Sequence, residues 1–104
     1  MRKIELKEVD AGQAGGVQLP SLNYAAVITQ ILSVKADGMM VPELRKCLGV
    51  LSAVEKSTDA VMLEEAEWQY LVERIQAHRW PVATPAVMAM IDEICSASVF
   101  DPNS

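Results

Sequence analysis

The chain has 104 residues, which is enough for one domain whose hydrophobic core needs neither disulfides nor a metal. Hydrophobic residues make up 51% of the chain but aromatic residues only 5%, so aliphatic side chains and six methionines must fill the interior. The net charge of −5 disfavours binding to nucleic acids and to anionic membranes, because like charges repel.

Two segments bear on where the protein resides. Residues 11–34 carry no charge, but three glycines and Pro20 interrupt them, which predicts a linker and a core helix instead of a membrane span. Arg2 and Lys3 are followed by Glu5, so the N-terminus lacks the apolar region of a signal peptide. We therefore expect a soluble, cytoplasmic protein.

A short strand is predicted near the N-terminus, because apolar and charged residues alternate along residues 3–9. The glycine-rich segment 10–16 follows, as a flexible connection or a long hairpin loop. Two partners for the strand stay open, namely Val17–Leu19 after the loop and Val61–Leu63 farther along the chain. Either pairing predicts a minor two-stranded β element.

The first helix is predicted over residues 22–36, with Ser21 or Asn23 as its N-cap and Gly38 ending it in the left-handed conformation. Most of its circumference is apolar, so we expect it to be the most buried helix. Its core-facing residues are predicted to be Tyr24, Val27, Ile28, Ile31 and Val34.

The second helix is predicted over residues 42–57, because Pro42 suits the first turn of a helix. Arg45 and Lys46 are expected to face solvent. Gly49 costs about 1 kcal/mol relative to alanine within a helix, which indicates a point where another helix crosses closely. The stripe expected to face the core consists of Leu44, Cys47, Leu48, Leu51 and Val54.

The third helix, predicted over residues 64–79, has the strongest helical period in the chain. Acidic residues occupy its first turn and basic residues its last turn, which complements the helix dipole. Pro81 is expected to end it, because proline disfavours a helical conformation in the residue before it. The apolar stripe is predicted to contain Trp68, Leu71, Val72 and Ile75.

A fourth helix is predicted over residues 85–97, with Thr84 as N-cap and Pro85 in the first turn. Residues 99–104 are expected to fray. The patterns together predict a mainly α fold, in which residues 1–104 form a single small domain of about four helices with a minor N-terminal two-stranded β element. The core-facing residues of the fourth helix are predicted to be Val87, Met90, Ile91, Ile94 and Ala97.

Reactive side chains are scarce, because the chain has one histidine and lacks the motifs of common hydrolases and nucleotide-binding proteins. His78 falls at the end of the third helix, where a cation complements the dipole. Cys47 and Cys95 lack metal-binding spacing and are expected to be free, buried thiols, with a disulfide between them left open. We therefore predict no catalysis, no structural metal and no cofactor.

Two surfaces are candidates for contact with another protein. One is the acidic group on the third helix, which consists of Glu64, Glu65, Glu67 and Glu73. Since this group lacks a glycine-bent calcium loop and partnering histidines, a solvated face is its simpler interpretation. The other is the corner of Arg79 and Trp80, because both residue types are common at interface hot spots. Trp80 is predicted either to anchor a partner or to cover the core, and the second arrangement is favoured.

The alternative function is a winged-helix-like DNA-binding transcriptional regulator, since residues 38–54 partly follow the helix-turn-helix pattern. With Gly49 as the turn glycine, however, Arg45 would occupy a position that must be small and Glu55 one that must be apolar. Such a regulator would bind DNA through Arg45 and Lys46, but the helix that follows them is acidic. Protein binding is the preferred function, and nucleic acid and membranes are disfavoured as partners.

The chain contains, in order, K-I-E-L-K-E-V, a glycine-rich connection, L-N-Y-A-A-V-I, V-M-L-E-E-A-E-W-Q-Y-L-V-E-R-I and R-W-P-V-A. This order, over most of the chain, resembles small acidic accessory proteins carried by tailed phages and prophages. Such proteins assist head or tail assembly or bind host factors. The resemblance implies a non-catalytic protein binder in the host cytoplasm, with a phage or host protein as partner, and it assigns no residue a role. Self-association is the other expected mode of binding.

Overall fold

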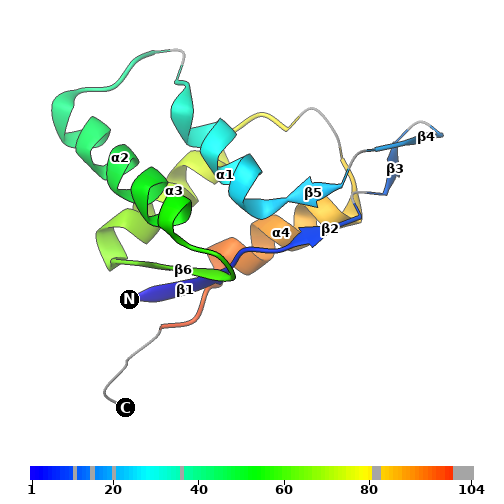
Figure 1. The fold of residues 1–104 in the computed structure, drawn as a ribbon. Helices are drawn as coiled ribbons and strands as arrows, with labels where there is room; N and C mark the ends of the chain where they lie inside the picture. Colours follow the sequence, from blue (N-terminus) through cyan, green and yellow to red (C-terminus); the bar gives the residue numbers. More distant parts are fainter. Residues whose placement is uncertain (11, 15, 20, 36, 81–82, 100–104) are drawn as a thin grey trace.

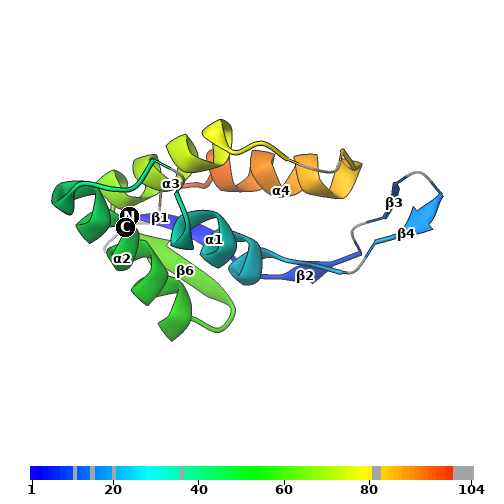
Figure 2. The same cartoon turned by 90° about the horizontal axis from the view of Figure 1, so that it is seen from above.

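The computed structural model describes residues 1–10, 12–14, 16–19, 21–35, 37–80 and 83–99. α1 and α2 lie side by side in Figure 1, and α3 contacts each of the other three helices. Seen from above, α3 and α4 form one row, and α1 and α2 both lie on one side of that row (Figure 2). The prediction of about four helices is confirmed in the described residues. Their bounds are α1 (Tyr24–Ser33), α2 (Val41–Lys56), α3 (Glu65–Ala77) and α4 (Pro85–Cys95).

The strands form three antiparallel pairs in the described part of the chain. The prediction of a single minor two-stranded element therefore underestimates the β structure. Of the two partners left open, the N-terminal strand pairs with the Val61–Leu63 segment and sets Ile4 opposite Val61. Val17–Gln18 instead closes a hairpin that projects away from the helices (Figures 1 and 2). The pairs are β1 (Arg2–Glu5) with β6 (Ala60–Leu63), β2 (Glu8–Val9) with β5 (Leu22–Asn23), and β3 (Gln13–Ala14) with β4 (Val17–Gln18).

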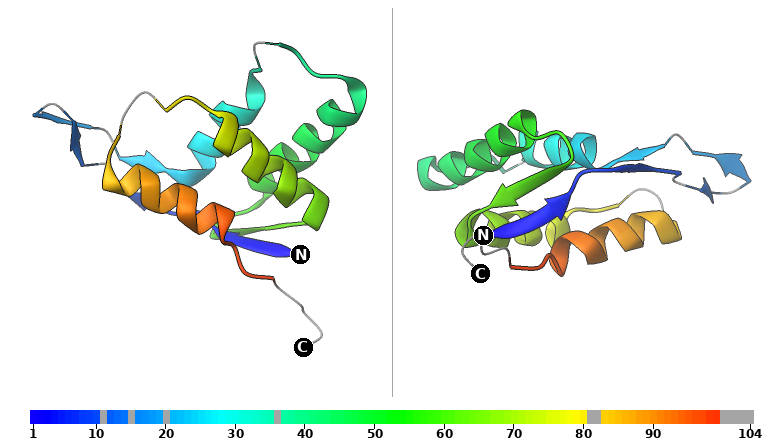
Figure 3. Two further views of the ribbon diagram at one scale, coloured as in Figure 1. Left: turned by 180° about the vertical axis from the view of Figure 1, so that it is seen from behind. Right: turned by 60° about the horizontal axis from the view of Figure 1, so that its bottom comes forward.

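The β1–β6 pair belongs to the core and is not a peripheral element. Ile4, Val61 and Leu63 are at most 3% exposed, because alternate side chains of the pair point toward the helices. The right-hand view of Figure 3 shows the two strands side by side, with α1 and α2 on one side of them and α3 and α4 on the other. The helices contribute the other fully buried side chains, which include Tyr24, Ile28, Leu32, Val50, Leu71, Ile75, Met90 and Ile94.

The buried face of α2 differs from the predicted stripe. Cys47 and Val54 are buried as predicted, but Leu44 and Leu48 are 42% and 56% exposed. Val50, which lies outside the predicted stripe, is fully buried instead. The reason is that α2 packs against both α1 and α3, so its rotation follows those contacts and not the centre of its apolar residues.

Local capping signals place the N-terminal ends of two helices correctly. Asn23 is the N-cap of α1, and its side chain accepts a hydrogen bond from the Ala26 amide at 3.0 Å. Thr84 is the N-cap of α4 and accepts a hydrogen bond from the Val87 amide at 3.3 Å. Of the two N-caps left open for α1, the structure therefore selects the asparagine.

The C-terminal end of α1 does not follow the prediction. The helix ends at Ser33, so Val34 lies outside it and is 76% exposed instead of facing the core. Gly38 has the predicted positive φ of 76°, but in a later turn. Arg74 of α3 satisfies backbone carbonyls at the end of α1 instead of the glycine. The Arg74 Nη2 donates to the Ile31 carbonyl at 2.7 Å and to the Val34 carbonyl at 3.1 Å.

The predicted end of the third helix and the predicted fraying tail fall partly outside the described residues. α3 ends at Ala77, and Pro81, the residue expected to end it, lies outside them. Of the predicted fraying tail, Val99 forms a β-bridge with Arg2, and residues 100–104 lie outside the described part of the chain.

Candidate interaction surface

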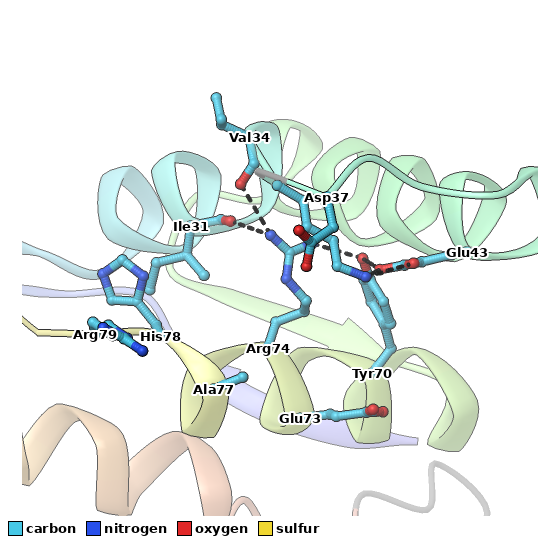
Figure 4. A pocket seen from close by; sticks show the side chains of 11 residues that line it. Ile31, Val34, Asp37, Glu43, Tyr70, Glu73, Arg74, Ala77, His78 and Arg79 are labelled. Carbon is cyan, nitrogen blue, oxygen red and sulfur yellow. Dashed lines mark hydrogen bonds and ion pairs between the residues drawn. The ribbon is translucent and has the colours of Figure 1, made fainter.

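A polar cleft of about 670 Å³ lies between the ends of α1, α2 and α3. Figure 4 shows that its central groups bond one another. The Arg74 guanidinium donates to the Tyr70 hydroxyl at 2.8 Å, and this hydroxyl donates to Glu43 Oε2 at 3.0 Å. Lys35 Nζ donates to both Glu43 oxygens, at 2.9 and 3.0 Å. Hydrogen bonds from Lys35 lower the pKa of Glu43, and burial raises the pKa of Tyr70. These hydrogen-bonded groups connect α2 to α3 and to the segment that follows α1.

Polar contacts also tie the N-terminal segment to the helices. The Arg2 guanidinium lies 4.1 Å from the centre of the Trp68 ring, a cation–π arrangement. Lys7 Nζ donates to Glu93 Oε1 at 2.8 Å, and the Tyr24 hydroxyl donates to Glu93 Oε2 at 2.7 Å. The hydrogen bonds from Lys7 and Tyr24 lower the pKa of Glu93. Burial, together with the nearby carboxylate, raises the pKa of Tyr24 to about 12.

The four carboxylates that the sequence predicts as one acidic surface have separate surroundings. Glu65 accepts hydrogen bonds from Arg2 at 2.9 and 3.0 Å, which lower its pKa. Glu67 Oε1 accepts a hydrogen bond from the Glu64 amide at 3.2 Å, and Glu73 lines the polar cleft. Two of the four therefore stabilise the fold. In the described residues, no group of three or more His, Cys, Asp or Glu is placed to hold a metal ion.

Trp80 covers the core, which is the favoured of its two predicted arrangements. It is half-buried, and its Nε1 donates to the Ile75 carbonyl at 3.4 Å. Its ring meets the His78 ring edge-on, with the ring centres 4.8 Å apart. Arg79 beside it is exposed and lines the polar cleft. The structure therefore places the two residues of this corner on different surfaces.

The cysteines are both free, as expected. Cys47 is buried and its thiol donates to the Leu32 carbonyl at 3.1 Å. Cys95 is only partly buried, and burial raises the pKa of its thiol. Burial and the nearby Asp92 carboxylate both disfavour the thiolate of Cys95, which is the reactive form of a cysteine.

The residues of the DNA-binding alternative lie on α2, where Arg45 and Lys46 are both exposed. Gly49 is a point of close approach, as predicted, because a Cβ atom at this position would overlap Glu67 Oε2 of α3. The helix that crosses α2 thus brings a carboxylate about one turn away from the two basic residues. A carboxylate at this place disfavours a phosphate backbone.

An exposed apolar surface, which helical periodicity alone does not reveal, runs along α2. Met40 is 80% exposed and Val41 60% exposed, and Leu44 and Leu48 continue the row. Steps of three and four residues place Val41, Leu44 and Leu48 on one helix face, and Met40 is the N-cap residue directly before them. We call these four side chains the α2 stripe. Leu51 extends the stripe and is half-buried. The sequence does carry a signal for this surface, because the apolar residues of α2 are numerous enough to cover two faces of the helix. Packing against a single core buries only one of those faces.

An apolar groove of about 870 Å³ lies between α1 and α2, beside the C-terminal half of the α2 stripe. Its α1 wall contains the small, uncharged side chains of Ala25, Ala26 and Thr29. Its α2 wall contains Leu48 and Leu51, so the groove and the α2 stripe are one continuous surface. We refer to it as the α1–α2 groove.

No family model, no curated protein and no solved structure matches the chain. Among the described residues, no helix has both the length and the apolar character that crossing a membrane requires. The α2 stripe with the α1–α2 groove is the candidate site on its geometry alone.

Proposed function

We propose that the chain is a non-catalytic protein–protein interaction module that binds its partner through the α2 stripe and the α1–α2 groove. The observation that supports this proposal is the exposure of Val41, Leu44 and Leu48 together on one helix face, next to the exposed N-cap residue Met40. Clustered apolar residues on a protein surface mark interaction sites, whereas single exposed ones are common.

Magnitudes favour this surface over the two predicted from the sequence. Burial of one leucine or valine side chain contributes about 1.5–3 kcal/mol, whereas an exposed ion pair contributes about 0–1 kcal/mol. Glu65 and Glu67 of the acidic group are already engaged within the fold. The α2 stripe offers several large side chains that no described part of the chain covers.

The biological setting is proposed from the resemblance to phage and prophage accessory proteins. It makes the partner a phage protein, a host protein or a second copy of the chain. The DNA-binding regulator has no structural observation in its favour beyond the exposure of Arg45 and Lys46.

The test is affinity capture from a lysate of the host, with nuclease present, using wild-type protein beside Leu48→Asp. Met88→Asp is the matched control, since Met88 is 53% exposed on α4 and lies outside the stripe. The proposal expects a defined protein that Leu48→Asp loses and Met88→Asp retains, with both variants folded by circular dichroism. Unchanged capture by Leu48→Asp would contradict it. Recovery of DNA alone, lost in Arg45→Ala/Lys46→Ala, would favour the regulator.

A further inference from the structure

We infer that the occupant of the α2 stripe and the α1–α2 groove is a second copy of this chain, bound across a two-fold axis with the two α2 helices antiparallel. The inference rests on the proposed function, because it assigns a partner to the same surface. Two-fold pairs are the commonest homo-oligomers, and they require a surface that is complementary to itself.

The surface is complementary to itself in shape. The protruding apolar side chains Met40, Val41 and Leu44 lie at the N-terminal end of α2. The α1–α2 groove, whose α1 wall includes the small side chains of Ala25 and Ala26, lies beside the C-terminal half of the same helix. Antiparallel pairing of two α2 helices places the protrusion of each copy over the groove of the other.

The spacing of the apolar residues along α2 also suits such a pair. Val41, Leu44, Leu48 and Leu51 are separated by three, four and three residues, which is the spacing of the apolar seam in a two-stranded coiled coil. In an antiparallel pair, Leu48 of one copy would face Leu51 of the other. This register carries Leu44 to the level of Glu55 in the second copy.

The charged residues of α2 also favour the antiparallel arrangement. Glu55 is the one charged residue that continues the row of the stripe, and Arg45 flanks the stripe at its other end. Neither side chain forms an ion pair or a hydrogen bond within the described residues. In the antiparallel register, Arg45 of one copy comes within about one residue rise of Glu55 in the other. Parallel pairing would instead bring like charges together.

The carboxylates of α3 add little repulsion to this pairing, because the paired surface is turned away from α3. Gly49, where Glu67 of α3 approaches, lies on the opposite side of α2 from Leu44 and Leu51 at 100° per residue. Glu43 points into the polar cleft, where Lys35 bonds both of its oxygens. Apart from Glu55, which Arg45 of the other copy approaches, the carboxylates nearest to α2 are therefore either outside the interface or neutralised.

Sedimentation equilibrium of the purified full chain tests the inference. The wild type is expected to dimerise, and Leu48→Asp to raise the dimer dissociation constant by at least about tenfold. Arg45→Glu and Glu55→Arg should each weaken the dimer by several-fold, and the double variant Arg45→Glu/Glu55→Arg should restore it. Lys46→Glu, which changes an exposed charge on another side of α2, should leave the dimer unchanged.

A wild type that stays monomeric to about 1 mM overturns the inference. So does a dimer that Leu48→Asp leaves intact, or a double charge variant that is no tighter than the single variants. The proposed function fails separately. A monomer whose capture of a lysate protein is lost in Leu48→Asp keeps the interaction surface and rejects the second copy as its occupant. A dimer that Leu48→Asp dissociates, without any lysate partner, supports self-pairing.

Discussion

Gly49→Ala is expected to leave the free energy of unfolding nearly unchanged or to lower it, although alanine is the better helix former. Within a helix, alanine is favoured over glycine by about 1 kcal/mol. The new Cβ, however, would overlap Glu67 Oε2, so the carboxylate must move. The same carboxylate accepts a hydrogen bond from the Glu64 amide at the start of α3. Loss of such a cap costs about 0.5–2 kcal/mol, which offsets or exceeds the gain.

A double-mutant cycle isolates this contact. In a Glu67→Ala background the obstacle is absent, so Gly49→Ala should raise the free energy of unfolding by about 1 kcal/mol. The coupling between the two positions should therefore be about 0.5–2 kcal/mol. Urea denaturation of the four proteins at one temperature measures it through the transition midpoints. An equal effect of Gly49→Ala in both backgrounds would refute the reasoning from close approach.

The remaining predictions concern protonation. Hydrogen bonds lower the pKa values of Glu43, Glu65 and Glu93 below 4.5, the ordinary pKa of a glutamate side chain. Below pH 4.5 the unfolded chain therefore takes up protons before the folded chain does, and the free energy of unfolding falls. Thermal melts from pH 7 to pH 3 should show this fall, and Glu93→Gln should make it shallower. Because the pKa of Tyr24 is about 12 and that of Tyr70 is also raised, the folded protein should show far less tyrosinate absorbance at pH 10 than the urea-unfolded chain. Between pH 10 and 12 the unfolded chain loses its phenol protons first, so stability should fall as pH rises. Half-ionised tyrosines in folded protein at pH 10 would contradict this.

The sequence predicts those features that depend on neighbouring residues. The four helices follow from a 3.6-residue period, from Asn23 and Thr84 as N-caps and from Pro42 and Pro85 in first turns. Such signals act within one turn of helix, so they are visible without knowledge of the fold. Gly49 belongs to the same class, because a glycine inside a helix lowers its stability and therefore indicates a position where a neighbouring element leaves no room for a Cβ atom.

The rotation of α2 could not be predicted, because apolar residues occupy two of its faces. Val50 and Leu48 are equally suited to a core, and only the positions of α1 and α3 decide between them. The candidate site is the face that those contacts leave exposed. Helical periodicity misses this face, because a single period assigns the apolar residues wholly to the core.

The polar contacts could not be predicted either, because they join residues that are far apart in the chain. The sequence pattern assigns Glu65 to a solvated face, but this residue bonds Arg2. Lys7 similarly meets Glu93 near the other end of the chain. A charge pattern within one helix carries no information about a partner contributed by another element.

The position of β1 has a consequence for how the protein is made. One edge of this strand pairs with β6, and its other side meets Ser98 and Val99 through the Lys3 amide and the bridge at Arg2. Both neighbours follow β1 in the chain, so during synthesis this strand must wait first for β6 and then for the segment around Ser98 before both of its sides are paired. In that interval β1 is an open edge that other nascent chains can join, and its alternating charged residues make such joining less favourable.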